Sequence, residues 1–164
     1  MKPEEFEEIY KKYFDTLYRI SFLYMKNDAD ALDVVQDVFV KVLSGKVTFL
    51  GEEQLKAWLL VTASNSCKSR LKRWWNKKRS EYTDECQNRV NSQAAPECSE
   101  VLEEVMALED KYRIPVYLHY YEGYSTIEIG QMLNISPSTI QTRLAKARKL
   151  LRLSLSEGEI CTEF

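Results

Sequence analysis

The sequence predicts an all-α protein: two small helical domains joined by a flexible linker. The 164 residues include only 5 glycines and 4 prolines, and strand-like alternation of apolar and polar residues is rare. Hydrophobic residues make up 45%, as in a folded chain. The middle of the chain is polar and has no helical apolar stripe. We therefore expect domains at 1–80 and 98–155, a linker at 81–97 and a tail at 156–164.

Two helices are predicted at the start of the first domain. Apolar residues at helical spacing predict a helix over 3–25. Asn27 and Asp28 provide a stop and a new cap, so a second helix is expected over 28–43. The inward side of this helix holds Ala31, Val35, Val38 and Val42. Another side is acidic and polar, and its simplest interpretation is a solvated surface: Asp33, Gln36, Asp37 and Val40.

A loop is predicted between the second and third helices. It spans 44–53 and contains two of the five glycines. Phe49 and Leu50 in this loop are either anchored in the core or exposed for contact, and both alternatives stay open.

The third predicted helix, over 54–79, has an apolar first half and a strongly basic second half. Residues 57–80 contain seven basic and no acidic residues. Trp74 and Trp75 lie among these cations, which fits single-stranded DNA because bases stack on aromatic rings while phosphates pair with cations. The alternative is that the tryptophans close the core against the first helix, and we expect at least one of them to do so.

The second domain is predicted to begin with two helices. Apolar spacing from Val101 onwards predicts the first of them. Proline fits best in a first helical turn, so Pro115 predicts that the next helix begins near Tyr112. Glu122 and Gly123 are expected to end it.

Residues 124–151 predict two short helices joined by a tight turn. Ser125 and Glu128 have the spacing of a capping box. Asn134 tolerates the left-handed conformation that ends a helix, and Ser136 can cap the next helix just before a proline. The first helix has an apolar side formed by Ile127, Ile129, Met132 and Leu133. This pattern is typical of a helix-turn-helix.

The second of these helices has two unlike faces. One is an apolar stripe: Ile140, Leu144, Ala147 and Leu151. The other carries hydroxyl and amide groups early and cations later, and residues 136–153 contain five basic and no acidic residues. Such a face suits a DNA major groove, because short polar groups reach base edges and cations reach phosphates. The alternative, a solvated amphipathic helix, does not account for the double cap and the acid-free face.

Other functional classes have little support. The cysteines, Cys67, Cys86, Cys98 and Cys161, form no C-x-x-C pair, so we expect free thiols and neither a metal nor a cofactor. His119, the single histidine, is expected to be structural. No nucleophile–base set, glycine-rich phosphate loop or carboxylate pair indicates an enzyme. No 18-residue apolar run or signal-peptide core is present, so a cytoplasmic protein without membrane insertion is expected.

The net charge of −2 hides a segregation of charge along the chain. Residues 57–80 and 136–153 are the basic segments described above, whereas 81–112 contains two basic and nine acidic residues. Two basic segments in an acidic chain suggest two separate contacts with nucleic acid.

These motifs resemble those of bacterial extracytoplasmic-function sigma factors. Residues 28–43 resemble region 2.2, with Asp33, Gln36, Asp37 and Phe39 matching D-x-x-Q-(D/E)-x-F. Residues 55–73 resemble regions 2.3 and 2.4, with matches at Trp58, Leu59 and Asn65. Residues 108–151 resemble region 4, with matches at Glu128, Ile129, Leu133, Ser136, Thr139, Arg143, Leu144, Ala147 and Arg148. Two motif blocks in order form a more specific signal than the helix-turn-helix alone.

Two positions depart from the family pattern. Gly130 stands where the family usually has alanine, and a glycine weakens a helix by roughly 1 kcal/mol. Lys146 replaces a frequent arginine.

The resemblance implies a protein that binds core RNA polymerase and directs promoter recognition, DNA melting and transcription initiation. It implies polymerase docking through region 2.2, by Asp33, Gln36, Asp37 and Val40. It implies binding of the −10 element, as duplex and melted single strand, by Asn65, Lys68, Lys72, Arg73, Trp74 and Trp75. It implies binding of the −35 element by Ser136, Ser138, Thr139, Gln141, Thr142, Arg143, Lys146, Arg148 and Lys149. An anti-sigma factor is a further expected partner.

Two alternative functions remain at this point. A helix-turn-helix repressor or activator would bind duplex DNA as a dimer, but it would leave the first 80 residues and the tryptophan-rich basic helix without a role. A sigma-like interaction module would dock on the polymerase without initiating transcription.

Overall fold

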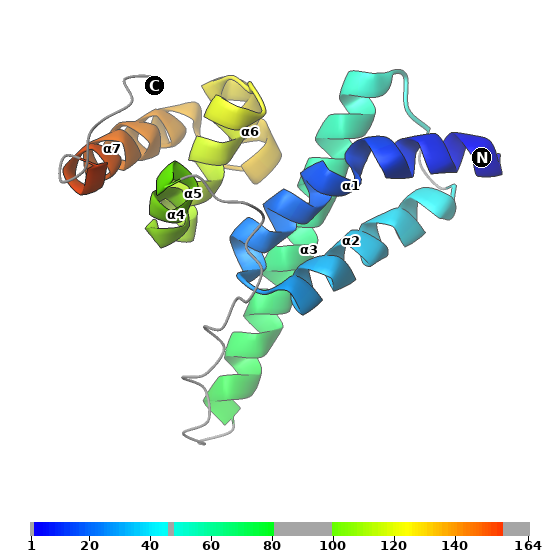
Figure 1. Cartoon of the computed structure of the whole chain (residues 1–164), viewed down its shortest axis with the longest axis horizontal. Coiled ribbons are helices and arrows are strands. Elements are labelled where there is room, and N and C mark those ends of the chain that lie inside the picture. Colours follow the sequence, from blue (N-terminus) through cyan, green and yellow to red (C-terminus); the bar gives the residue numbers. More distant parts are fainter. Residues whose placement is uncertain (1, 46–47, 81–99, 156–164) are drawn as a thin grey trace. The chain divides into compact units, whose positions relative to one another are not determined.

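The computed structural model describes residues 2–45, 48–80 and 100–155, and it has helices and no strand over these residues (Figure 1). The predicted all-α fold is therefore confirmed. The chain forms two compact units, Met1–Ala94 and Ala95–Phe164, each of which is described by itself. The predicted linker at 81–97 and tail at 156–164 lie outside the described residues.

The described residues of the first unit form three helices, α1 (Pro3–Met25), α2 (Asp28–Leu43) and α3 (Glu52–Ser80), with α1 packed on both of the others. The predicted stop between α1 and α2 is confirmed. Lys26 is left-handed, with φ 59°, and its N–H donates to the carbonyl of Phe22. The side chain of Asn27 then accepts a hydrogen bond from the N–H of Asp30 at 2.8 Å.

Two polar contacts join the helices of this unit. Tyr18 on α1 donates a hydrogen bond to Asp28 at the start of α2, and burial together with this bond raises the pKa of Tyr18 to about 12. Lys12 on α1 lies 2.5 Å from Glu52, which begins α3 two residues earlier than predicted. A carboxylate is favoured in a first helical turn, and the hydrogen bond from Lys12 lowers the pKa of Glu52.

The core of the first unit is apolar and comes from all three helices. Leu17 and Ile20 of α1 and Leu60 of α3 are completely buried. The inward residues predicted for α2 are buried, as expected: Ala31, Val35, Val38 and Val42. Full burial of an aliphatic side chain stabilises the fold by roughly 1.5–3 kcal/mol, so these contacts provide the main support for α2.

The two adjacent tryptophans of α3 lie outside this core, and the prediction that at least one closes it was wrong. Trp74 is half-buried and Trp75 is 57% exposed. Both residues belong to the last turns of α3, and these turns extend beyond the ends of α1 and α2 (Figure 1). The rings instead contact each other at 5.0 Å, and the Lys78 ammonium lies 4.1 Å from the Trp74 ring.

In the loop before α3, one of the two apolar residues, Phe49 and Leu50, is anchored in the fold and the other is exposed. The Phe49 ring packs on Trp58 at a centroid distance of 5.3 Å, so Phe49 is anchored. Leu50 is 98% exposed, and its N–H donates to the side chain of Gln54. The loop ends two residues earlier than predicted because Glu52 and Glu53 belong to α3.

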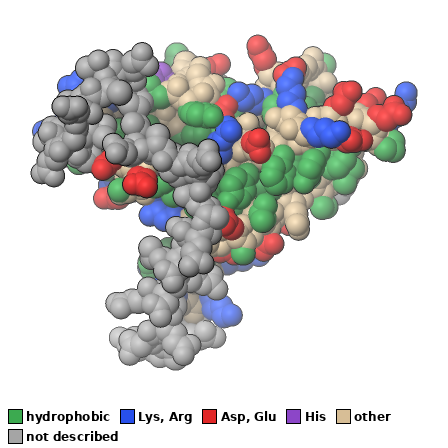
Figure 2. Space-filling view, in the orientation of Figure 1, with side chains coloured by type: hydrophobic (Ala, Val, Ile, Leu, Met, Phe, Trp, Pro, Cys, Tyr) green, Lys and Arg blue, Asp and Glu red, His purple; other side chains and the backbone are tan. Residues whose placement is uncertain are grey.

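A ladder of aromatic rings follows one side of α1 at four-residue spacing. Phe6, Tyr10, Phe14, Tyr18 and Phe22 contact one another in succession. The Phe39 ring of α2 lies 4.7 Å from that of Tyr10. Figure 2 shows a band of hydrophobic side chains over α1 and α2 on the face seen there.

The second unit consists of α4 (Glu100–Ala107), α5 (Asp110–Val116), the π-helix η2 (Tyr117–Tyr121), α6 (Thr126–Leu133) and α7 (Pro137–Leu155). Helix α7 packs against α4, α5 and α6. The apolar stripe predicted for α7 is buried in this unit: Ile140, Leu144, Ala147 and Leu151.

Helix α5 differs from its prediction at its start. It begins at Asp110 and so places Pro115 in its second turn. Proline cannot donate to the carbonyl four residues earlier, which belongs to Lys111. Lys111 is exposed, so water can reach this part of the helix. The helix widens directly afterwards, where the N–H of Glu122 donates to the carbonyl of Tyr117, five residues back.

A buried arginine, which sequence analysis missed, joins α4 to α5. Arg113 has no exposed side-chain surface, yet it carries a full charge. One of its terminal nitrogens donates to the carbonyls of Met106 and Leu108, at 3.0 and 2.8 Å, and the other donates to Asp110. The guanidinium thereby satisfies carbonyls at the end of α4 that have no partner within that helix.

Gly130 allows a close approach between α6 and the turn that follows it. Its carbonyl accepts the N–H of Ile135 at 2.9 Å. A Cβ at this position would lie 2.6 Å from the carbonyl oxygen of Ile135 and 3.4 Å from the nitrogen of Pro137. Both are backbone atoms, so an alanine here would displace the turn.

We expect Gly130→Ala to destabilise the second unit, although helix propensity alone would favour alanine by about 1 kcal/mol. Overpacking of this kind costs typically about 1–3 kcal/mol. Urea denaturation followed by circular dichroism measures the change in the free energy of unfolding. Gly51→Ala is the matched control, because a Cβ at Gly51 meets no atom within 4 Å. A Gly130→Ala variant that is more stable than the wild type would contradict the steric argument.

Candidate nucleic-acid and protein interfaces

The helix-turn-helix predicted from the sequence is present, and its caps have the expected partners. Ser125 accepts the N–H of Glu128, while Glu128 accepts the N–H of Ser125 at 2.8 Å, which lowers the pKa of Glu128. Asn134 is left-handed, with φ 56°. Ser136 accepts the N–H of Thr139 and so caps α7. One detail was wrong: Ile127 is exposed, because it lies on the outer side of α6.

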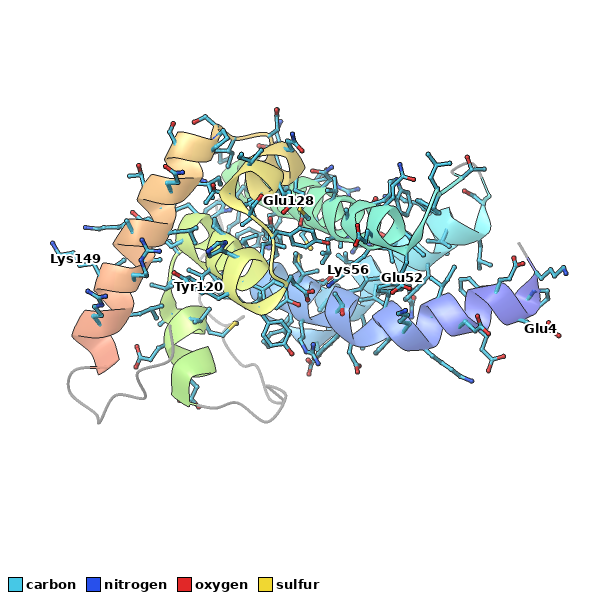
Figure 3. The ribbon with its side chains drawn as sticks, turned by 90° about the horizontal axis from the view of Figure 1, so that it is seen from above. Glu4, Glu52, Lys56, Tyr120, Glu128 and Lys149 are labelled. Atoms are coloured by element: carbon cyan, nitrogen blue, oxygen red, sulfur yellow. The ribbon has the colours of Figure 1, made fainter. Side chains whose placement is uncertain are left out.

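The polar face predicted for α7 is open to solvent. Thr139 and Arg143 at its margin are half-buried. Lys149 points outward from α7 (Figure 3). The other predicted contact residues are exposed: Ser136, Ser138, Gln141, Thr142, Lys146 and Arg148.

Hydrogen bonds orient several hydroxyl groups at the start of α7. The hydroxyl of Thr142 donates to the carbonyl of Ser138 at 3.0 Å, so the oxygen of this exposed residue keeps its lone pairs as acceptors. The hydroxyls of Ser136 and Thr139 lie 2.7 Å apart. These groups have the size and chemistry needed to contact base edges in a major groove.

A hollow of about 490 Å³ lies beside this face and includes two residues that sequence analysis missed. Lys111 and Tyr112 belong to α5, and the Lys111 ammonium lies 5.0 Å from the Tyr112 ring. A hydrogen bond to Glu109 raises the pKa of Lys111. Residues of α7 form the rest of the wall: Ser138, Thr139, Thr142, Arg143 and Lys146. The residues of α5 and those of α7 meet only because α5 packs on α7. No sequence motif indicates this packing.

The opposite flank of α7 is held by the π-helix. Arg148 donates a hydrogen bond to the hydroxyl of Tyr120 at 2.8 Å, so this cation is tethered at the edge of the polar face. The neighbouring His119 contacts the carbonyl of Tyr124 through Nδ1 at 2.7 Å. This contact ties η2 to the start of the helix-turn-helix and agrees with a structural role for His119.

The acidic side of α2 is exposed as predicted. Asp33 and Asp37 are 59% and 52% exposed, Gln36 is exposed, and Val40 is 64% exposed. The two acids have a partner that was not predicted. Arg70 on α3 contacts Asp37 at 2.5 Å and lies 3.6 Å from Asp33. The hydrogen bond to Asp37 raises the pKa of Arg70, and the charges of the nearby acids add to the effect.

A second hollow, of about 340 Å³, lies between α2 and α3. It brings Asn65 and Arg73, two residues predicted to bind DNA, next to the acidic side of α2. The remaining wall is polar: Asp37, Lys41, Thr62, Ser66, Ser69 and Arg70.

The residues predicted to bind the −10 element do not all share one surface. Lys68 and Lys72 are exposed one and two turns after Asn65. Trp74 follows Asn65 by nine residues, which at about 100° per residue places it on the opposite side of α3. Trp75 lies nearer to the Asn65 side and is the more exposed of the two rings.

No group of three or more His, Cys, Asp or Glu residues in the described part of the chain could hold a metal ion. Cys67 is a buried thiol, whereas Cys86, Cys98 and Cys161 lie outside the described residues. No helix in that part of the chain is long and apolar enough to span a membrane.

Comparison with known proteins identifies both units. Residues 9–77 match the family model of sigma-70 region 2, and residues 98–151 match that of sigma-70 region 4. The RNA polymerase sigma factor SigV of Bacillus subtilis is 29% identical over 148 residues, which cover 87% of this chain and 86% of that protein. The ECF RNA polymerase sigma factor SigW of the same bacterium is 26% identical, over 94% of this chain and 90% of that protein.

A solved structure has the same fold. The sigma factor RpoE of Bartonella quintana, in complex with the anti-sigma factor NepR, has a TM-score of 0.71 and 18% identity, covering 95% of this chain and 99% of that one. Region 2 and region 4 thus match in order along a chain whose second unit contains a helix-turn-helix with an exposed, acid-free face on α7. The chain belongs to the extracytoplasmic-function sigma factors of the sigma-70 family.

Proposed function

We propose that this sigma factor divides its task among three surfaces, two on the first unit and one on the second. As a sigma factor it binds core RNA polymerase and directs promoter recognition, DNA melting and transcription initiation. Sigma factors are non-catalytic initiation factors, and we infer that this chain has no catalytic activity of its own. The assignment depends above all on the presence of both sigma-70 regions in one chain.

We assign residues 1–80 to polymerase docking and the −10 element, 98–155 to the −35 element, and 81–97 to a linker between them. Docking is proposed for the exposed side of α2: Asp33, Gln36, Asp37 and Val40. Its support is the combination of two acids with an exposed valine, since a buried apolar centre with a polar rim is typical of protein interfaces.

The −10 element is assigned to the basic side of α3. Asn65 and Arg73 share a hollow, and Lys68 and Lys72 are exposed nearby, so a single strand can contact a base-reading amide and several cations together. Stacking is worth about 1–3 kcal/mol per base. Trp75, with its exposed ring, is proposed as the stacking residue, while Trp74 supports it edge to face.

The −35 element is assigned to α7, with Ser136, Ser138, Thr139, Gln141, Thr142 and Lys146 near base edges and Arg143, Arg148 and Lys149 on phosphates. The support for this division is the early position of the short polar groups along α7 and the outward direction of Lys149 (Figure 3).

We expect Thr142→Ala and Lys149→Ala to have different effects on −35 binding. Loss of the Thr142 methyl and acceptor should change base preference by about 1–3 kcal/mol at one position. Loss of Lys149 should weaken binding to all sequences and lower the salt slope by about one. Selection from a promoter library, with binding measured at several salt concentrations, distinguishes them. Equal shifts in base preference would contradict the division.

An anti-sigma factor is proposed as a further partner, acting in the cytoplasm, where the polymerase and promoter DNA are. Two observations support it: the related fold of RpoE was solved with the anti-sigma factor NepR, and a hydrophobic band runs over α1 and α2 (Figure 2). Exposed apolar bands of this kind are typical of protein-binding surfaces.

The test of the proposed function is run-off transcription with core polymerase and this chain alone. Promoter-dependent transcripts are expected only when both are present. A repressor would neither bind core polymerase in gel filtration nor yield transcripts. A sigma-like module that only docks would bind the polymerase without producing them.

A further inference from the structure

One arginine lies between the two proposed surfaces of the first unit. Arg70 of α3 donates to Asp37 of α2 at 2.5 Å, and a second nitrogen lies 3.6 Å from Asp33. The same guanidinium lines the hollow that contains Asn65 and Arg73. It is 25% exposed, whereas both carboxylates are more than half exposed. The ion pair can therefore be reached by a protein on α2 and by a nucleic acid on α3.

The ion pair keeps the charge of Arg70 from acting fully on a phosphate. The field of a guanidinium that faces two carboxylates is largely cancelled at the distance of a DNA strand. Drawing Arg70 away would also leave two neighbouring acids without a counter-charge. Arg73 lines the same hollow but takes no part in the ion pairs of Asp33 and Asp37, so its charge has no such restriction.

A basic group on a docking partner changes this balance. If it pairs with Asp33 and Asp37, it replaces Arg70, whose guanidinium is then available to a phosphate in the hollow. In the reverse order, a phosphate that attracts Arg70 leaves the two acids more attractive to a basic partner. Each binding event thus strengthens the other, and by linkage the two effects are equal in magnitude.

We propose that Arg70 is a positioning residue that couples polymerase docking to binding of the −10 strand by exchanging partners. It pairs with Asp33 and Asp37 in the free protein and with a DNA phosphate in the holoenzyme. The inference depends on the proposed function, because it uses the assignment of α2 to the polymerase and of the Asn65 side of α3 to DNA. The DNA contacts assigned above stay as they are. Arg70 adds one further cation to them, and it does so only when its ion pairs with Asp33 and Asp37 are broken.

The experiment compares single-strand affinity in the free chain and in the holoenzyme. The probe is a labelled single-stranded DNA that the wild-type holoenzyme selects from a random pool, and fluorescence anisotropy is read at low salt, where both forms bind. Arg70→Gln is expected to weaken binding about fivefold in the holoenzyme, at the low end of known couplings, and less than twofold in the free chain. It should also reduce the salt slope of the holoenzyme by about 0.7.

A double-mutant cycle in the free chain tests the exchange directly. Asp37→Asn should strengthen single-strand binding about fivefold by releasing Arg70, and the double variant Asp37→Asn with Arg70→Gln should lose that gain. Asp15→Asn removes an exposed acid from α1 and controls for the change in net charge. Arg70→Lys keeps the charge, so part of the difference in single-strand affinity between the free chain and the holoenzyme should remain. Thermal denaturation verifies that each variant is folded.

The outcomes separate this inference from the proposed function. If Arg70→Gln lowers single-strand affinity equally in the free chain and in the holoenzyme, Arg70 is a structural link or an ordinary DNA contact. That result would contradict the coupling but would leave the proposed function unaffected. Arg73→Gln should weaken binding equally in both states. If neither Arg73→Gln nor Asn65→Ala weakens binding by the holoenzyme, the assigned −10 surface is wrong and the coupling fails with it.

Discussion

Replacing Arg113 with methionine is expected to destabilise the second unit strongly while the first unit keeps its stability. Methionine fills a similar volume but cannot donate hydrogen bonds. The carbonyls of Met106 and Leu108 would then lose their shared donor, and Asp110 would lose its ion pair. Each buried acceptor without a partner costs roughly 1–3 kcal/mol, so the total loss is roughly 2–5 kcal/mol. A domain of this size has a total stability of only about 4–10 kcal/mol.

The positions of the tryptophans allow the two units to be monitored separately. Trp58, Trp74 and Trp75 are the three tryptophans of the chain, and all lie in the first unit. Circular dichroism at 222 nm reports helices of both units, whereas tryptophan fluorescence reports the first alone. For Arg113→Met we expect part of the helical signal to be lost at a lower temperature than in the wild type, with an unchanged fluorescence transition.

An exposed arginine provides the control for this substitution. Arg152→Met removes the same charge from the surface of α7 and should leave both signals close to those of the wild type. Arg113→Lys keeps a charge but cannot donate to three acceptors in the same geometry, so an intermediate loss is expected. If Arg113→Met melts like Arg152→Met, the buried guanidinium does not hold α4 and α5 together.

Local signals in the sequence predicted most of the helices and their caps. The stop at Asn27, the capping box of Ser125 and Glu128, and the left-handed Asn134 each depend on residues within a few positions of one another. The buried stripes of α2 and α7 follow from helical periodicity in the same way. Such features need no knowledge of the tertiary structure.

Contacts between helices could not be predicted from these signals. Arg70 and Lys111 gain their place at the candidate sites only when α3 packs near α2 and α5 packs near α7. The close approach at Gly130 depends on the path of the following turn, so helix propensity alone gave an incomplete account of this residue. Trp74 and Trp75 looked suited to the core by composition, but the length of α3 carries them beyond it.

Reversing the charge of the α2 docking surface is expected to lower affinity for core polymerase by roughly 1–3 kcal/mol for each residue. Asp33→Lys and Asp37→Lys each replace a carboxylate by a cation on an exposed surface. Both substitutions also place a second cation beside Arg70, which contacts Asp37 at 2.5 Å and lies 3.6 Å from Asp33, so part of their effect would come from strain between α2 and α3. The affinity losses of these two variants alone therefore do not identify the docking surface.

Val40→Lys removes this ambiguity. Val40 is 64% exposed, lies one turn from Asp37 and Gln36, and takes no part in the ion pairs of Arg70. A lysine there introduces charge at the apolar part of the proposed interface without disturbing the contact between α2 and α3. Asp15→Lys, an exposed substitution on α1, is the control for net charge. Biolayer interferometry on immobilised core polymerase should show weaker binding for Val40→Lys and Asp33→Lys but not for Asp15→Lys. If all three bind as tightly as the wild type, the polymerase docks on another part of the first unit, and the acids of α2 serve mainly to hold Arg70.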